Sequence, residues 1–130
     1  MLYRMETSEG SISFTKNVIG KIVVESVKKY NGKVLISNQK GKVPGIVRKI
    51  GGMDDINNME IAMGPMGLDV RVFVVIHFGT SIGYVTNNLI EDIYNQIKEY
   101  TDLEPNSVAI VVTGIISKQQ ISRRNIEVKR

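Results

Sequence analysis

The chain has 130 residues, 42% of them hydrophobic, and carries a formal net charge of +4. This size suits one globular domain around a single core. The chain contains no cysteine, which excludes disulfides, thiolate nucleophiles and cysteine-ligated zinc. No stretch approaches the roughly 20 apolar residues of a membrane-spanning helix, and the N-terminus lacks a signal peptide's apolar run. We therefore expect a cytoplasmic protein.

The charges are unevenly distributed along the chain. Residues 16–49 hold nine basic residues against one acidic residue, and residues 117–130 hold five against one. Residues 80–106 hold five acidic residues against one basic residue. The basic segments fit nucleic acid, anionic lipid, an acidic protein or the acidic segment of a second copy, and a merely solvated lysine face is equally open. The candidate partner-binding residues are Lys28, Lys29, Lys40, Lys42, Arg48, Lys49, Arg123 and Arg124.

The first half of the chain predicts an edge strand, a helix and a hairpin. Gly10–Phe14 fits a short edge strand, and Thr15 fits the N-cap of a helix that ends at Asn31-Gly32. Residues 34–36 fit a strand, and residues 44–50 fit a single helical turn opened by proline. Residues 59–63 fit a strand that a Gly-Pro-Met-Gly turn joins to the next one as an antiparallel hairpin. The apolar stripe of the helix consists of Ile19, Ile22, Val23, Val27 and Tyr30.

Residues 68–79 predict the central strand of the fold. Alternate residues there are apolar, which places them on one core-facing side of an extended chain. These residues are Leu68, Val70, Val72, Val74, Ile76 and Phe78. The opposite side, which contains Asp69, Arg71 and His77, is only half apolar.

A second helix and another strand follow. Thr80 or Ser81 fits the N-cap of a helix whose apolar stripe consists of Ile82, Val85, Leu89, Ile90, Ile93, Ile97 and Tyr100. Residues 107–116 then form a strand that is apolar on both sides, which is typical of a strand inside a sheet. Its predicted faces are Val108, Ile110, Val112 and Ile116 on one side, and Ala109, Val111 and Ile115 on the other.

The order strand, helix, strand over residues 68–116 predicts a right-handed crossover between parallel strands. The expected fold is α+β, a two-layer sandwich. It has a mixed sheet of three to four strands and two main helices packed on one face. Residues 1–116 form the expected single domain, and residues 117–130 form an expected basic, flexible tail.

No set of residues indicates catalysis. His77 is the single histidine and has no companion at a suggestive spacing, so we interpret it as a residue of the sheet surface. The glycines around Thr80 and Ser81 fit a helix cap better than a phosphate loop, because no lysine follows at the required place. The methionines at positions 53, 59, 63 and 66 fit apolar filler better than a copper site. We expect no enzyme activity, cofactor or metal.

Three stretches together resemble the alkaline shock or general stress protein family of Gram-positive bacteria. They are residues 10–19, residues 70–82 and residues 100–115, within a resemblance that covers about residues 10–116. The chain differs from the family pattern at Asp102, where the family usually has glycine, and it is richer in lysine over residues 33–42. The resemblance implies no catalytic residues. It implies a cytoplasmic scaffold tied to cell-envelope stress, held near the membrane by a small membrane-anchored partner.

Two hypotheses on function follow. The first is a non-enzymatic scaffold or adaptor in envelope stress homeostasis, peripheral to the membrane, which forms homo-oligomers and binds a membrane-anchored protein. Its self-association pairs two sets of opposite charge, which are Lys28, Lys29, Lys40, Lys42, Arg48 and Lys49 against Glu91, Asp92 and Glu99. The alternative is a nucleic-acid-binding or regulatory module that uses the basic half and the tail, with an affinity that falls steeply as salt rises.

Overall fold

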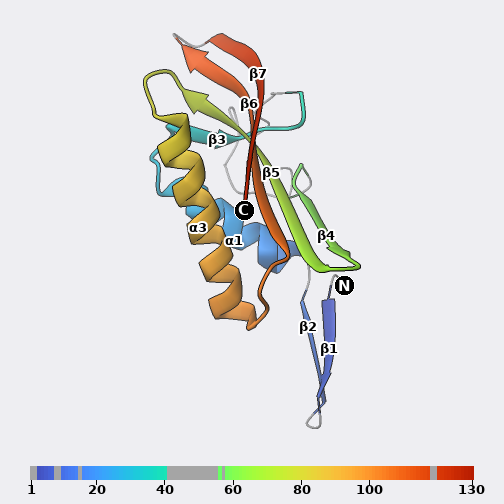
Figure 1. The fold of residues 1–130 in the computed structure, drawn as a ribbon. Helices are drawn as coiled ribbons and strands as arrows, with labels where there is room; N and C mark the ends of the chain where they lie inside the picture. Colours follow the sequence, from blue (N-terminus) through green and yellow to red (C-terminus); the bar gives the residue numbers. More distant parts are fainter. Residues whose placement is uncertain (1–2, 8–9, 15, 41–55, 57, 118–119) are drawn as a thin grey trace.

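The computed structural model describes residues 3–7, 10–14, 16–40, 56, 58–117 and 120–130. Two long helices, α1 (Lys16–Lys28) and α3 (Ile82–Thr101), lie beside a five-stranded mixed sheet (Figure 1). The strands are β1 (Tyr3–Thr7), β2 (Gly10–Phe14), β3 (Val34–Ile36), β4 (Glu60–Gly64), β5 (Gly67–His77), β6 (Ser107–Ser117) and β7 (Gln120–Lys129). The predicted α+β class, with helices packed against a mixed sheet, is confirmed. The predicted number of three to four strands is too low, because Gln120–Lys129 adds a strand to the sheet.

Strand β5 is the centre of the sheet. One of its edges pairs antiparallel with both β4 and β3, which follow each other along it, and its other edge pairs with β6. The β5–β6 pair is parallel and α3 joins the two strands, so the predicted crossover is confirmed. The predicted hairpin is also confirmed, because Gly64 pairs with Gly67 across the turn.

The core lies between the sheet and the two helices. Leu68, Val70, Val72, Val74 and Ile76 of β5 are at most 1% exposed and belong to one apolar cluster with the stripes of α1 and α3. Phe78 was expected on the same face but is 77% exposed. It lies beyond the end of β5 at His77, where the alternation of a strand no longer applies.

The predicted end of the first helix is confirmed. Helix α1 stops at Lys28, and Asn31 and Gly32 take φ angles of 54° and 84°. The predicted strand Gly10–Phe14 also forms, but it pairs with β1 in a separate two-stranded sheet that projects from the main body (Figure 1). Thr15 and the predicted turn over residues 44–50 lie outside the described residues.

The last segment of the chain is a strand, which corrects the expected flexible tail. Residues Gln120–Lys129 form β7, an antiparallel partner of β6. Val128 packs against the core, and the Arg130 guanidinium lies 4.0 Å from the centre of the Tyr94 ring on α3. This segment therefore pairs with the edge of β6, although its charged composition predicts a loose tail.

A β-bulge at Thr113 changes which residues of β6 face the helices. Val112 pairs with Val74, but Gly114 is the residue that pairs with Val75, so Thr113 is an extra residue in β6. The bulge reverses the alternation after this point. Ile115 then pairs with core-facing Ile76, and Ile116 pairs with exposed His77, which is the opposite of the predicted faces.

Both ends of α3 have capping residues. Ser81 is the N-cap, and its hydroxyl accepts a hydrogen bond from the backbone N–H of Tyr84 at 3.2 Å, as predicted. Asp102 is the C-cap in the left-handed region, with φ 59° and ψ 15°, and its N–H donates to the Lys98 carbonyl. This is the position at which the resembling family usually has glycine, and the backbone geometry explains that preference.

Asp102→Gly is expected to stabilise the protein by about 0.5–1 kcal/mol, because glycine adopts this conformation without strain. The substitution also removes a negative charge from the negative end of the helix dipole. Urea unfolding followed by circular dichroism measures the change. As a control, Asn87→Gly on the exposed face of α3 should lower the free energy of unfolding by about a few tenths of a kcal/mol. Destabilisation by Asp102→Gly would contradict the strain argument.

Candidate interaction surface on the helix layer

A shallow groove of about 1070 Å³ separates α1 from α3 on the outer surface of the helix layer. Its α1 side is lined by Val18, Lys21, Ile22, Glu25, Lys28 and Lys29. Its α3 side is lined by Asp92, Asn95, Gln96, Glu99 and Tyr100. The basic first half and the acidic segment of the sequence therefore meet along one groove of a single molecule.

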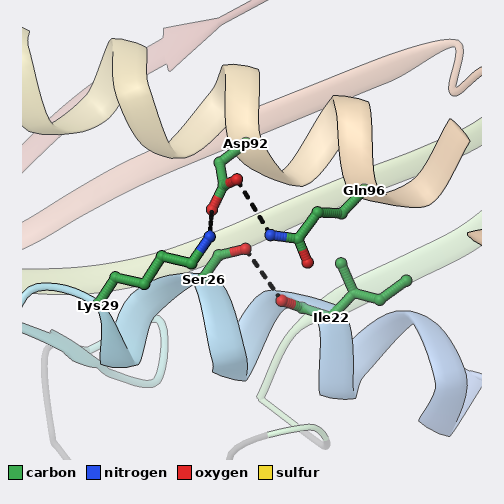
Figure 2. Close-up of polar contacts among 5 residues, drawn as sticks. All are labelled: Ile22, Ser26, Lys29, Asp92 and Gln96. Carbon is green, nitrogen blue, oxygen red and sulfur yellow. Dashed lines mark hydrogen bonds and ion pairs between the residues drawn. The ribbon is translucent and has the colours of Figure 1, made fainter. Parts of the chain in front are cut away.

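An ion pair joins the two helices across this groove. The Lys29 Nζ lies 2.9 Å from the Asp92 Oδ2, and the Gln96 amide donates to Asp92 Oδ1 at 3.0 Å (Figure 2). Below this pair, the buried Ser26 hydroxyl donates to the Ile22 carbonyl of its own helix. The charges that the sequence hypothesis assigned to contacts between copies are thus partly used within one copy.

The polar contacts change the acidity of Asp92. Partial burial raises the pKa of its carboxyl, but the hydrogen bonds from Lys29 and Gln96 and the positive charge of Lys29 outweigh that effect, and the pKa lies below its ordinary value of 3.8. A carboxylate with a lowered pKa in the folded state stabilises the fold at neutral pH. That contribution disappears as the pH falls through the folded-state pKa.

Asp92→Asn is therefore expected to lower the free energy of unfolding at pH 7 by up to about 1 kcal/mol, as for a partly exposed ion pair. The loss should persist from pH 7 to about pH 5 and disappear as the pH falls through the folded-state pKa, where the wild-type carboxyl also becomes protonated. Urea unfolding at several pH values measures it. Lys29→Met should show a loss with the same pH dependence. A loss that stays equal in size from pH 7 down to the lowest pH at which the protein remains folded would contradict this account.

Of the candidate partner-binding residues, the structure brings Lys28 and Lys29 together at the groove. Lys28 Nζ lies 3.5 Å from the Glu25 carboxylate, one helical turn away. Lys40 lies away from the groove, in a turn after β3, where its N–H donates to the Asn38 side chain. Arg123 and Arg124 belong to β7, in the sheet layer. Lys42, Arg48 and Lys49 lie outside the described residues.

Two apolar residues of the groove were not predicted as surface residues. Tyr100 was assigned to the buried stripe of α3 but is 69% exposed, and Val18 on α1 is 42% exposed. Helical spacing alone extends the stripe to Tyr100, but the residue of α3 that is buried after Ile97 is Thr101, four positions on, and not Tyr100. Apolar and charged side chains therefore lie together at this end of the groove.

The face of the sheet turned away from the helices holds a smaller polar hollow of about 390 Å³. Arg71 on β5 lies 2.9 Å from the Glu127 carboxylate and 3.9 Å from that of Glu60. Asp69 accepts hydrogen bonds from Asn106 and Ser107, which lower the pKa of its carboxyl. These groups pair with one another, as cross-strand side chains of a solvated sheet face do.

The sequence of this chain matches a known protein family. A family model described as having a cell envelope-related function matches residues 4–117. The chain belongs to the alkaline shock protein 23 family. No curated protein and no solved structure matches it. The family match ends at Ser117, the last residue of β6, so β7 and its arginines lie beyond the matched part.

Two side chains that the sequence offers for catalysis or anion binding, His77 and Ser81, are exposed on the alkaline shock family domain. His77 is exposed at the end of β5, and Ser81 is engaged as a helix cap. Within the residues described, no three His, Cys, Asp or Glu side chains gather closely enough to hold a metal. None of the helices there is long and apolar enough to cross a membrane. The helix groove is therefore the strongest candidate surface.

Proposed function

We propose that this chain is a non-enzymatic scaffold or adaptor in cell-envelope stress homeostasis. It self-associates in the cytoplasm and binds a membrane-anchored protein, which keeps it at the membrane surface. Family membership supports the link to the envelope. The groove between α1 and α3 supports a protein as the partner, and it is the observation that carries the proposal.

The groove has the composition of a protein-binding surface. Three lysines and three carboxylates line it, so their formal charges cancel. A groove that tracks phosphates needs an excess of cations. Exposed Tyr100 and Val18 add apolar area among these charges, and tyrosine is enriched in protein interfaces.

Nucleic-acid binding is the second candidate, because Arg123, Arg124 and Lys129 follow one another along β7. That function requires a gel shift with short DNA or RNA at about 50 mM salt, where electrostatic binding is strong, and its loss as salt rises. The scaffold proposal expects no shift under those conditions.

The scaffold proposal is tested by sedimentation with membranes. The purified protein should sediment with native membranes of its source organism, and not with protein-free vesicles made from the same lipids. Protease treatment of the membranes before mixing should abolish binding, because the anchor is a protein. Equal binding to protein-free vesicles would show direct contact with lipid, and absence of binding to native membranes would contradict the proposed anchor.

A further inference from the structure

We infer that two copies of this chain associate face to face through the helix groove. The two lining sides of the groove are called its α1 wall and its α3 wall. The basic α1 wall of each copy lies over the acidic α3 wall of the other copy, and the two copies are related by a two-fold axis that runs along the groove. This inference rests on the self-association proposed above and assigns it a surface and a symmetry.

The two walls of the groove carry opposite charge. The α1 wall has Lys21, Lys28 and Lys29 against Glu25, whereas the α3 wall has Asp92 and Glu99 with no basic lining residue in the described part. A two-fold axis along the groove places each wall against the unlike wall of the other copy. An axis across the groove would place each wall against its own kind and bring like charges together, which is unfavourable.

Two of these charges remain available for a partner. Lys29 is paired with Asp92 and Lys28 with Glu25 inside one copy. Lys21 and Glu99 have no ion pair among the residues that the structure describes. They are the natural cross-pair of a face-to-face dimer.

The geometry of the helices places this pair at one end of the groove. In Figure 2 the direction from Lys29 to Ile22 along α1 matches the direction from Asp92 to Gln96 along α3, so the helices are antiparallel. Lys21 lies eight residues before Lys29, and Glu99 lies seven residues after Asp92, which is about 10–12 Å along each helix. Lys21 and Glu99 therefore lie at the same level along the groove. The proposed axis then places Lys21 of one copy opposite Glu99 of the other copy.

The exposed apolar residues lie at the same end. Val18 is one helical turn before Lys21, and Tyr100 is adjacent to Glu99 in sequence. Interface energy concentrates where a large aromatic side chain is shielded from water beside paired charges. We therefore place the centre of the contact at Val18, Lys21, Glu99 and Tyr100.

Charge reversal tests the cross-pair. Lys21→Glu and Glu99→Lys should each raise the dimer dissociation constant about tenfold or more, and the double variant should recover most of that loss. Lys98→Glu is the matched control, because Lys98 is exposed on α3 but does not line the groove. Sedimentation velocity over a range of concentrations at low salt measures each constant. Failure of the double variant to recover, or an equal effect of the control, would overturn this surface.

Cross-linking tests the axis. Because the chain has no cysteine, Lys21→Cys and Glu99→Cys each introduce a single thiol. A mixture of the two variants, distinguished by tags of different size, should form mixed disulfide dimers far faster than either variant alone. Predominance of dimers linked through two copies of the Lys21→Cys variant would favour the other axis and overturn the proposal. A wild-type protein that stays monomeric at all concentrations would reject the self-association itself, whereas a dimer insensitive to these changes would reject this surface alone.

Discussion

Val74→Asp is expected to abolish the native fold. Val74 is fully buried at the centre of the sheet, where it pairs with Ile36 on β3 and Val112 on β6 and belongs to the core cluster that includes both helices. Among the described residues no lysine, arginine or histidine is buried, so the carboxylate would be buried without a basic partner. Burying an unpaired charge costs several kcal/mol, and a domain of this size has only about 5–15 kcal/mol of stability. Circular dichroism and solubility after expression measure the outcome.

The matched control introduces the same residue into the same strand. His77 is exposed at the end of β5, so His77→Asp should change the free energy of unfolding by no more than about 0.5 kcal/mol. Val74→Ala should leave a folded protein, because it removes apolar volume without adding a charge. A soluble Val74→Asp variant with native circular dichroism would show that β5 is not the core strand.

The elements of this fold that depend on one dominant physical signal are predictable from the sequence. The alternation from Leu68 to Ile76 defines the buried face of β5, since every second side chain of a strand points the same way. The stripes of α1 and α3 follow with equal clarity, because their residues recur at the period of a helix. The crossover then follows from the order of the elements and the chirality of the chain.

The elements that depend on long-range strand pairing are not predictable from local composition. Residues 120–129 are polar and basic, which favours a solvated tail, yet they add a strand to the open edge of β6. No property of that segment alone reveals that an edge is available to it. The bulge at Thr113 is also a property of the pairing between β5 and β6, and an alternating pattern cannot place it.

The candidate surface was partly predictable from the distribution of charge along the sequence. The self-association hypothesis paired lysines of the first half with carboxylates of residues 80–106 in a second copy. The structure adds that Lys29 and Asp92 meet within one molecule. Which charges stay available to a partner depends on the packing of α1 against α3, and that packing identifies Lys21 and Glu99.

Thr113→Val is the second substitution with a large expected effect, a loss of about 1–3 kcal/mol in the free energy of unfolding. The Thr113 side chain is 2% exposed, and its hydroxyl donates to the Val74 carbonyl at 3.1 Å, where the bulge interrupts the ladder. The same hydroxyl lies 2.6 Å from the buried Ser37 hydroxyl, which follows β3. Valine keeps the shape but removes the hydrogen bond to the Val74 carbonyl, and it leaves the Ser37 hydroxyl with the Asn38 carbonyl alone. Urea unfolding measures the loss.

Thr86→Val is the matched control for this loss. Thr86 is as deeply buried, but its hydroxyl donates to the Ile82 carbonyl of its own helix, an acceptor that the helix backbone already serves. The substitution there should cost clearly less than at Thr113. The double variant Ser37→Ala with Thr113→Val should lose less free energy of unfolding than the two single variants lose together. The difference should be about 0.5 kcal/mol or more, because the two hydroxyls contact each other. Equal losses at positions 86 and 113, with strict additivity, would show that the bulge is maintained by the backbone pairing of β5 and β6 alone. The expected result would instead show that the buried Thr113 hydroxyl links β3, β5 and β6 at the bulge, where the register of the sheet changes.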